Sequence, residues 1–291
     1  MNFITAAGLF DDWATDVFTG KGPELWRIGA GFEPVELGPG LVTLIGGAPG
    51  AGKTAVTMQW TVDALRLDGG LRALACNVEM APRTLLDRQL ARLAGLDAGH
   101  VRHRWLAGQE TRVRAGVDAL RGLADRLAFH IGPPALVDVA RSVDGFGARL
   151  LVLDYIQRFT LGAGDTPVDK RAELDGIMSY VRKFADAGLG VLAVSAVARQ
   201  KGKHGSNYVG LGLASYRGSS ELEYGADSCW TLEADDDHWG VVNLCCVKNR
   251  HGETPSLLLN FDRARQSFTV VGPAHAAALP AKEDEYASPE E

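Results

Sequence analysis

The sequence predicts an α/β fold in which helices flank a mostly parallel central sheet and antiparallel strands extend it at the C-terminal end. Two observations support this prediction. Between Leu41 and Val197, short apolar runs alternate with segments of helical periodicity, which is typical of parallel strands joined by helices. After Ser228 the helical segments give way to strands joined by turns, which indicates an antiparallel extension of the sheet.

An N-terminal arm is expected over residues 1–37, before the alternating region. Its apolar side chains recur at a spacing compatible with a short amphipathic helix. Packing on its own domain and docking on a neighbouring subunit are both open roles, because a face with several aromatic rings needs a surface to cover. The apolar residues of this stripe are Phe3, Leu9, Phe10, Trp13, Val17 and Phe18.

The main domain is expected over residues 38–272, followed by a disordered acidic tail over 273–291 that is rich in Ala, Pro and Glu. The alternating strands are expected over residues 41–45, 72–78, 127–131, 150–154 and 191–197. The helices are expected over residues 54–67, 82–93, 116–124, part of 134–146, and 172–187. The turn-linked strands are expected over residues 229–232, 241–248, 255–261 and 267–271.

Composition limits the partners of the chain. The formal net charge of −6 excludes an overall basic field, so any nucleic-acid surface must be a local basic patch. The four cysteines lack the spacing of metal ligands and are expected to be reduced thiols. The sequence shows neither a signal peptide nor an apolar run of membrane-spanning length, so we expect a cytoplasmic location and no membrane partner.

A complete nucleotide-binding motif, G-x-x-x-x-G-K-[ST], lies between the first strand and the first helix. Its backbone N–H groups and the helix N-terminus suit the phosphates of a nucleotide. Lys53 can reach the β- and γ-phosphates, and Thr54 can bind Mg²⁺. The alternative is a glycine turn that binds nothing. The residues expected around the phosphates are Gly47, Ala48, Pro49, Gly50, Ala51, Gly52, Lys53 and Thr54.

Two carboxylates follow other strands of the predicted sheet. Asp154 ends an apolar strand at the carboxyl edge, where it can hold Mg²⁺ beside Thr54; the alternative is a helix cap. ATP hydrolysis also needs a base for the attacking water. Tyr155 occupies the position after Asp154, so the base is expected from the neighbouring strand, and Glu79 is the candidate. The alternative for Glu79 is an ordinary surface residue at a strand end.

Three basic segments complete the set of candidates. Lys248 and Arg250 are two residues apart in a strand, so they project to one side and can address a γ-phosphate; a solvated turn is the alternative. The other two segments suit phosphate-backbone contact, or are solvated loops. Charge alone does not distinguish DNA from RNA or an acidic protein. The candidate nucleic-acid contacts are Lys170, Arg171, Arg199, Lys201, Lys203 and Arg217.

These segments, in this order, resemble the RecA-like motor domain of the DnaB family of replicative hexameric helicases from about Trp26 to Val271. The phosphate loop is similar to that of the family, and the shared order of several shorter motifs makes the resemblance specific. The similar segments are GGAPGAGKT at 46–54, NVEM at 77–80 with LLDR at 85–88, LDYIQ at 153–157, residues 217–227, and KNRHG at 248–252.

The resemblance implies a P-loop NTPase that uses ATP and Mg²⁺ and assembles into a homo-oligomer, a hexameric ring in this family, with ATP at the subunit interfaces. It implies 5′–3′ movement along single-stranded DNA in replication, together with other replication proteins. It also implies that Glu79 is catalytic, that Gln157 lies at the nucleotide, and that Lys248 and Arg250 reach the nucleotide of the adjacent subunit.

The sequence departs from the family pattern in three places. A short arm stands where the family has an N-terminal helical collar domain, so we expect a motor domain without the collar. Ala196 follows Ser195 where the family often has Gln, and the basic loop matches only loosely. Two alternatives to a helicase follow. One is a DNA-binding ATPase that does not unwind, such as a recombination mediator or a plasmid or phage replication accessory. The other is a nucleotide-gated interaction protein.

Overall fold

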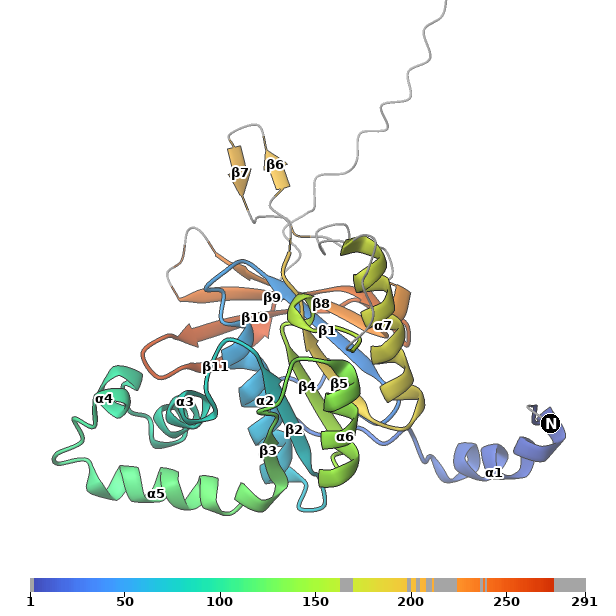
Figure 1. The fold of residues 1–291 in the computed structure, drawn as a ribbon, viewed down its shortest axis with the longest axis horizontal. Helices are drawn as coiled ribbons and strands as arrows, with labels where there is room; N and C mark the ends of the chain where they lie inside the picture. Colours follow the sequence, from blue (N-terminus) through green and yellow to red (C-terminus); the bar gives the residue numbers. More distant parts are fainter. Residues whose placement is uncertain are drawn as a thin grey trace, which may run out of the picture.

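The computed structural model describes residues 3–162, 170–197, 200–202, 205–207, 211, 224–235, 238 and 240–274. In these residues a nine-stranded sheet forms the centre, with helices on both faces (Figure 1). The strand order is β11-β10-β9-β8-β1-β5-β4-β2-β3. The strands are β1 (Val42–Gly47), β2 (Ala73–Asn77), β3 (Leu127–Phe129), β4 (Leu150–Asp154), β5 (Gly190–Val194), β8 (Ser228–Ala234), β9 (Val241–Asn249), β10 (Ser256–Asp262) and β11 (Ser267–Pro273).

The predicted α/β fold with a mostly parallel sheet is confirmed, with one correction. Strands β1, β2, β3, β4 and β5 pair in parallel, and β9, β10 and β11 form the antiparallel extension. The expected strand 229–232, however, is β8, which is parallel to β1 and antiparallel to β9. Its first five residues are buried, as in a parallel strand covered on both faces, and this burial distinguishes β8 from the alternating β9.

The helices agree with the sequence except in the region after residue 95. There the structure has an additional short helix, and the expected helix 116–124 begins earlier, at Glu110. Six residues are too few for helical periodicity to show in the sequence. Within the described residues no helix combines the length and the apolar character needed to cross a bilayer. The α-helices are α1 (Ala6–Thr19), α2 (Lys53–Leu67), α3 (Pro82–Ala94), α4 (Ala98–His103), α5 (Glu110–Arg121), α6 (Leu136–Phe146) and α7 (Lys170–Asp186).

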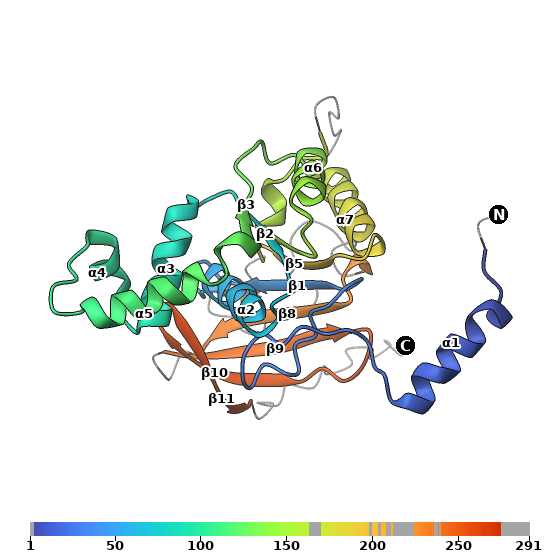
Figure 2. The ribbon, with the colours of Figure 1, turned by 90° about the horizontal axis from the view of Figure 1, so that it is seen from below.

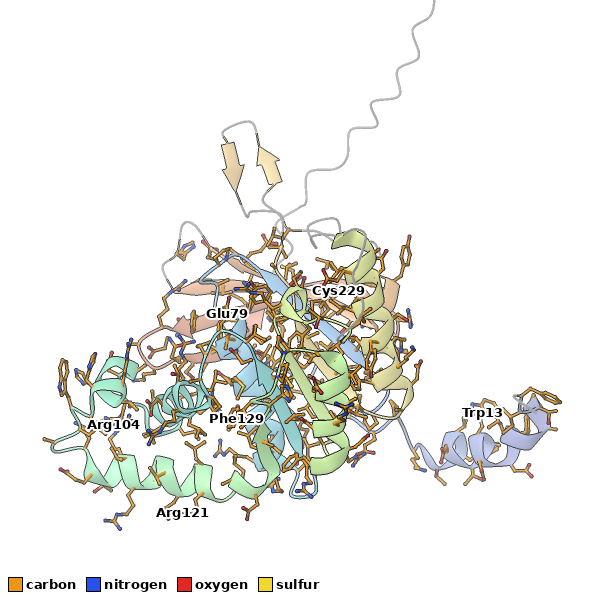
Figure 3. All side chains as sticks on the ribbon, viewed as in Figure 1. Trp13, Glu79, Arg104, Arg121, Phe129 and Cys229 are labelled. Carbon is orange, nitrogen blue, oxygen red and sulfur yellow. The ribbon has the colours of Figure 1, made fainter. Side chains whose placement is uncertain are left out.

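The predicted apolar helix of the arm is α1, which begins at the capping residue Thr5 and ends at Gly20. None of its residues is buried, and both views place it away from the sheet (Figures 1 and 2). Figure 3 shows Trp13 on this isolated helix. The stripe therefore does not pack on its own domain. Residues 26–37 behave differently, because Trp26 and Leu37 are buried with the core, and we propose that the separate arm ends before Trp26.

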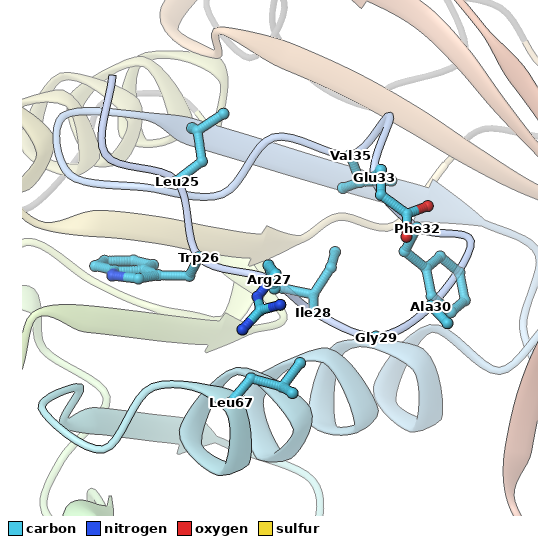
Figure 4. A pocket seen from close by; sticks show the side chains of 10 residues that line it. All are labelled: Leu25, Trp26, Arg27, Ile28, Gly29, Ala30, Phe32, Glu33, Val35 and Leu67. Carbon is cyan, nitrogen blue, oxygen red and sulfur yellow. The ribbon is translucent and has the colours of Figure 1, made fainter. Parts of the chain in front are cut away.

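Two hydrophobic layers cover the two faces of the sheet. On one face lie α2 and the segment 25–35, which precedes β1 in the chain. This segment runs beside α2, and together with Leu67 it lines a small groove of about 350 Å³ (Figure 4). On the other face lie α6 and α7 (Figure 2). Every residue of α2 from Ala55 to Leu65 is buried. This helix is therefore held on all sides, and its N-terminus is fixed at the end of β1.

Gln59 fastens α2 to the edge of the sheet. Its side-chain amide donates to the backbone oxygen of Phe268 and accepts from the backbone N–H of Phe268, both at 2.8 Å. Phe268 lies on β11, the edge strand, whose outward backbone groups would otherwise lack a partner. Because Gln59 is 5% exposed, both hydrogen bonds are shielded from water.

Replacing Gln59 with Leu should therefore lower the free energy of unfolding by about 1–3 kcal/mol for each backbone group of Phe268 left without a partner. Urea unfolding followed by circular dichroism measures this change. The matched control is Thr61→Val on the same helix, because the Thr61 hydroxyl bonds only to the Thr57 carbonyl one turn earlier. Equal stabilities of the two variants would contradict the role given to Gln59.

Candidate nucleotide-binding site

The phosphate loop joins β1 to α2 in a shape that only glycine permits at two positions. A Cβ on Gly47 would lie 2.7 Å from the backbone oxygen of Leu232. A Cβ on Gly52, whose φ is +95°, would lie 2.6 Å from the Phe268 ring. The loop is therefore wedged against β8 and β11, and α2 begins directly after it at Lys53.

A cavity of about 700 Å³ opens beside this loop and brings together most of the predicted site residues. Ala48, Ala51 and Gln157 are not among its lining residues, although all three are described. The predicted residues that line it are Gly47, Pro49, Gly50, Gly52, Lys53, Thr54, Glu79 and Asp154. The other lining residues are Ala55, Met80, Arg88, Tyr155, Val194, Ala196, Val197, Phe261, Arg263 and Gln266.

Asp154 is the centre of the polar contacts in the cavity. Its Oδ2 accepts from the Thr54 hydroxyl at 2.6 Å and from the Asn77 side-chain amide at 2.7 Å. Lys53 Nζ donates to the backbone oxygens of Gly47 and Ala48 at 2.7 and 2.9 Å. A hydroxyl and a carboxylate are the oxygen ligands that Mg²⁺ prefers. The residues present therefore fit a magnesium ion bound with a nucleotide.

Burial opposes the charges of this site. Burial raises the pKa of Asp154, and the Glu79 carboxylate raises it further, while the Thr54 hydrogen bond, Lys53 and Arg88 lower it. Burial lowers the pKa of Lys53 and of Arg88, and Asp154 partly restores both. Groups whose ionised forms are disfavoured by burial are typical of functional sites. A polyanion bound with a cation would compensate both kinds of charge.

Asn77 connects the Asp154 carboxylate to the turn that carries Glu79, and the sequence analysis did not assign it to the site. Its amide nitrogen donates to Asp154, and its amide oxygen accepts from the backbone N–H groups of Glu79 and Met80 at 2.9 and 2.7 Å. Asn77 thereby fixes the turn on which Glu79 stands. Glu79 is exposed and lines the cavity, and its role as the base stays a prediction.

Arg88 and Arg263 are two further cations that the sequence analysis did not assign to the site. Arg88 lies on α3, nine residues after Glu79 within the resembling segment, so its spacing could have indicated it. Arg263 comes from the β10–β11 turn and donates to the backbone oxygen of Gly50 at 2.8 Å. Its separation from the loop by more than two hundred residues leaves no local pattern to detect.

Gln157 does not line the cavity, and its side chain joins the segments that follow β4 and β5. Its side chain donates to the Ser195 hydroxyl at 2.7 Å and accepts from the backbone N–H of Ala196 at 3.1 Å. Its predicted contact with the nucleotide remains untested by this geometry. These two hydrogen bonds position Ser195 and Ala196 after β5, and Ala196 lines the cavity.

Lys248 and Arg250 lie together but outside the lining of this cavity. Lys248 Nζ donates to the Ala226 backbone oxygen at 2.6 Å. Arg250 pairs with Asp227 at 2.9 Å and donates to the Tyr224 backbone oxygen at 2.8 Å. Both cations therefore occupy a common site beside Asp227. Their side chains do not serve the phosphate loop of their own chain in this structure.

The predicted nucleic-acid contacts are only partly within the described residues. Arg199, Lys203 and Arg217 lie outside them. Lys170 and Arg171 stand at the start of α7, and Lys201 lies in β6 (Gln200–Gly202). Strand β6 pairs with β7 (Gly205–Asn207) in a hairpin that projects above the body of the protein (Figure 1).

The sequence profile of the DnaB-like helicase C-terminal domain matches residues 25–270. The chain belongs to this family. The resemblance found in the sequence, over about Trp26 to Val271, is thus confirmed. The comparison with curated proteins gives no match.

Two solved structures share the fold of this DnaB-like domain. The "ATPase Domain of G40P" has a TM-score of 0.77 and 17% identity, and covers 92% of this chain and 99% of its own. "The Structure Of A DnaB-Like Replicative Helicase And Its Interactions With Primase" has a TM-score of 0.75 and 17% identity, and covers 92% of this chain and 67% of its own. These likenesses confirm the predicted RecA-like fold.

The raised pKa of Asp154 predicts a pH dependence. A proton and Mg²⁺ compete for this carboxylate, so Mg²⁺-dependent nucleotide binding should weaken as the pH falls, and at a higher pH than for a carboxyl with the ordinary value of 3.8. In the metal-free protein, folding stability depends on pH in the opposite direction. Because the folded-state pKa of Asp154 is raised, the Asp154 contribution to the free energy of unfolding is present at low pH and is lost as the pH rises through that pKa.

Fluorescent-nucleotide titrations with Mg²⁺ across a pH series measure the first effect, and thermal unfolding without Mg²⁺ measures the second. The control is Asp154→Asn, in which both pH dependences should shrink together. A metal-binding pH profile that is the same in Asp154→Asn as in the parent protein would contradict this assignment.

Proposed function

We propose that this protein is an ATP-hydrolysing DnaB-like motor that moves along single-stranded DNA in replication. The main support is the cavity lined by Lys53, Thr54, Asp154 and Glu79, which lie at the carboxyl ends of β1, β4 and β2. A phosphate loop, a metal-holding pair and a candidate base are the parts that phosphoryl transfer to water requires. Membership in the DnaB-like family supports the same reaction.

The residues of the chain divide the work of hydrolysis. The loop N–H groups and Lys53 hold the phosphates, and Thr54 with Asp154 would hold Mg²⁺, which supplies positive charge to the transferred phosphoryl group. Glu79 orients the attacking water and takes its proton. Arg88 lines the cavity and interacts electrostatically with Asp154, so it adds a second cation to the site. Catalysis then rests on positioning and on preorganised charge.

Lys248 and Arg250 would complete the site of an adjacent subunit. Both are gathered beside Asp227, and neither lines the cavity of its own chain. The Arg250 side chain is 47% exposed, so it can release Asp227 and reach a neighbour. In this arrangement ATP would lie between two copies of the chain in a homo-oligomer, for which we propose a hexameric ring.

The arm is suited to hold such a ring together. The exposed apolar face of α1 and the tip formed by α4 lie at opposite ends of the molecule (Figures 1 and 2). Three aspartates and no basic residue occur in α1. The α4 tip is basic, with Arg102, His103 and an exposed Trp105. A head-to-tail contact between these ends repeats around a ring.

DNA contact is proposed for the basic segments. The β6–β7 hairpin and the start of α7 carry Lys201, Lys170 and Arg171, and the remaining candidates are Arg199, Lys203 and Arg217. We further propose 5′–3′ movement, a cytoplasmic location and other replication proteins as partners, on the family resemblance alone. The direct test of the function is ATP turnover with and without single-stranded DNA, measured together with native mass.

A shared site predicts complementation between two inactive variants. Lys53→Ala should lower kcat by at least about 10²-fold, because the phosphates lose their main cation. Arg250→Ala should also lower kcat, and mixing the two variants should restore part of the turnover, since some interfaces then combine an intact Lys53 with an intact Arg250. The control is Arg141→Ala, which breaks an exposed pair with Asp138 on α6. Unchanged turnover of Arg250→Ala would refute the trans role.

The arm proposal predicts that apolar contacts of α1 control assembly. Replacing Phe10 and Trp13 together with Ala should shift the native mass toward the monomer and make ATP turnover depend on protein concentration. Thr15→Ala on the same helix is the control, because it leaves the apolar stripe intact. Native mass spectrometry and sedimentation measure the change. A double variant that assembles as the parent protein does would exclude the arm from the interface.

Ala196 favours one alternative function, a DNA-binding ATPase that does not unwind. It lines the cavity without a polar side chain that could respond to the γ-phosphate. A strand-displacement assay separates this alternative from a helicase. The third candidate is a nucleotide-gated interaction protein. Such a protein would show no salt-dependent binding to single-stranded DNA.

A further inference from the structure

An ion pair between Asp63 and Arg92 joins α2 to α3 away from the cavity. The two guanidinium nitrogens Nη1 and Nη2 contact the two carboxylate oxygens at 2.9 and 3.0 Å. The Arg92 and Asp63 side chains are 8% and 12% exposed. The Arg92 Nε also donates to the Oε1 of the buried Gln89 at 2.9 Å. The guanidinium is thus fixed in its plane, and a two-bond fork sets the orientation as well as the distance between the two helices.

Stability alone does not explain this pair. Removing two charges from water costs about as much as their attraction returns, so apolar residues of similar size can replace a buried pair without loss of stability. A planar two-bond contact gives something that apolar side chains do not, because it permits one rotation and one axial position of α3 against α2.

The two joined helices carry opposite sides of the nucleotide site. Lys53 and Thr54 start α2, ten and nine residues before Asp63. Arg88 lies one turn before Arg92 on the same helix and lines the cavity. The turn with Glu79 leads into α3 at Pro82. A rotation or slide of α3 would therefore move Arg88 and Glu79 relative to Lys53 and Thr54.

We propose that the Asp63–Arg92 pair is a positioning device for hydrolysis, which holds Glu79 and Arg88 in register with Lys53 and Thr54. This inference rests on the proposed ATPase function. It assigns no contact with the nucleotide to either residue. Loss of the pair should leave the phosphate loop intact, since α2 is buried from Ala55 to Leu65, and should displace Glu79 and Arg88.

The test compares Arg92→Met and Arg92→Lys in the full chain. A displacement of the order of 1 Å between reacting groups can cost about 10²-fold in rate. Arg92→Met should therefore lower kcat by about 10- to 100-fold, while the Kd of a fluorescent ATP analogue stays within about threefold, a small effect on the binding scale. Arg92→Lys keeps the charge but loses the fork, so its kcat should also fall.

The matched control is Val143→Ala on α6, a core substitution remote from α3 that lowers the unfolding temperature but should keep kcat. Hydrogen exchange gives a second readout that needs no turnover: Arg92→Met should speed exchange in Pro82–Ala94 and leave Lys53–Leu67 protected. A parent protein without turnover would refute the proposed function, and the exchange pattern would still decide the inference. Unchanged α3 exchange, or a normal kcat in Arg92→Lys, would overturn it.

Discussion

The burial of α2 from Ala55 to Leu65 is the constraint on which the rest of the structure depends. A helix enclosed from Ala55 to Leu65 has a single position relative to the sheet, and its N-terminus is the phosphate loop. The hydrogen bonds of Gln59 to the edge strand β11 close this enclosure on one side. The ion pair of Asp63 with Arg92 extends it to α3. Rigid packing in one helix thus defines where both sides of the nucleotide site stand.

In the single chain, the charges of the nucleotide site are only partly compensated. Burial opposes the charge of Asp154, Lys53 and Arg88, and each is only partly compensated by the others. Such a site gains more from a bound phosphate chain with its metal than a solvated site would, because the same desolvation strengthens each new contact. Asn77 then has a structural role, since its side-chain amide joins the Asp154 carboxylate to the turn that carries Glu79.

The surfaces at the two ends of the molecule expose side chains that suit contacts with another chain. One end presents an apolar, acidic helix, and the other presents a basic tip with an exposed tryptophan. The cations beside Asp227 lie apart from the cavity that they are proposed to serve. Each of these features is explained if the functional unit contains several copies, and in that arrangement one chain carries only parts of each active site.

The sequence by itself determined the local elements of this protein. Strands and helices that alternate along the chain, and the phosphate loop between β1 and α2, depend on neighbours in sequence, so apolar periodicity and glycine spacing were sufficient to predict them. The placing of Asp154 and Glu79 at one sheet edge followed from parallel strands alone. The resemblance to the DnaB family was likewise contained in short motifs and their order.

Only the tertiary structure decided which distant residues complete the site. Arg263 reaches Gly50 from a turn between two C-terminal strands, and β8 joins β1 in parallel although turn-linked strands follow it. The same holds for Asp63 and Arg92, whose pairing depends on how two helices pack. Such contacts arise from packing between segments far apart in the chain. The local periodicity of strands and helices does not predict them.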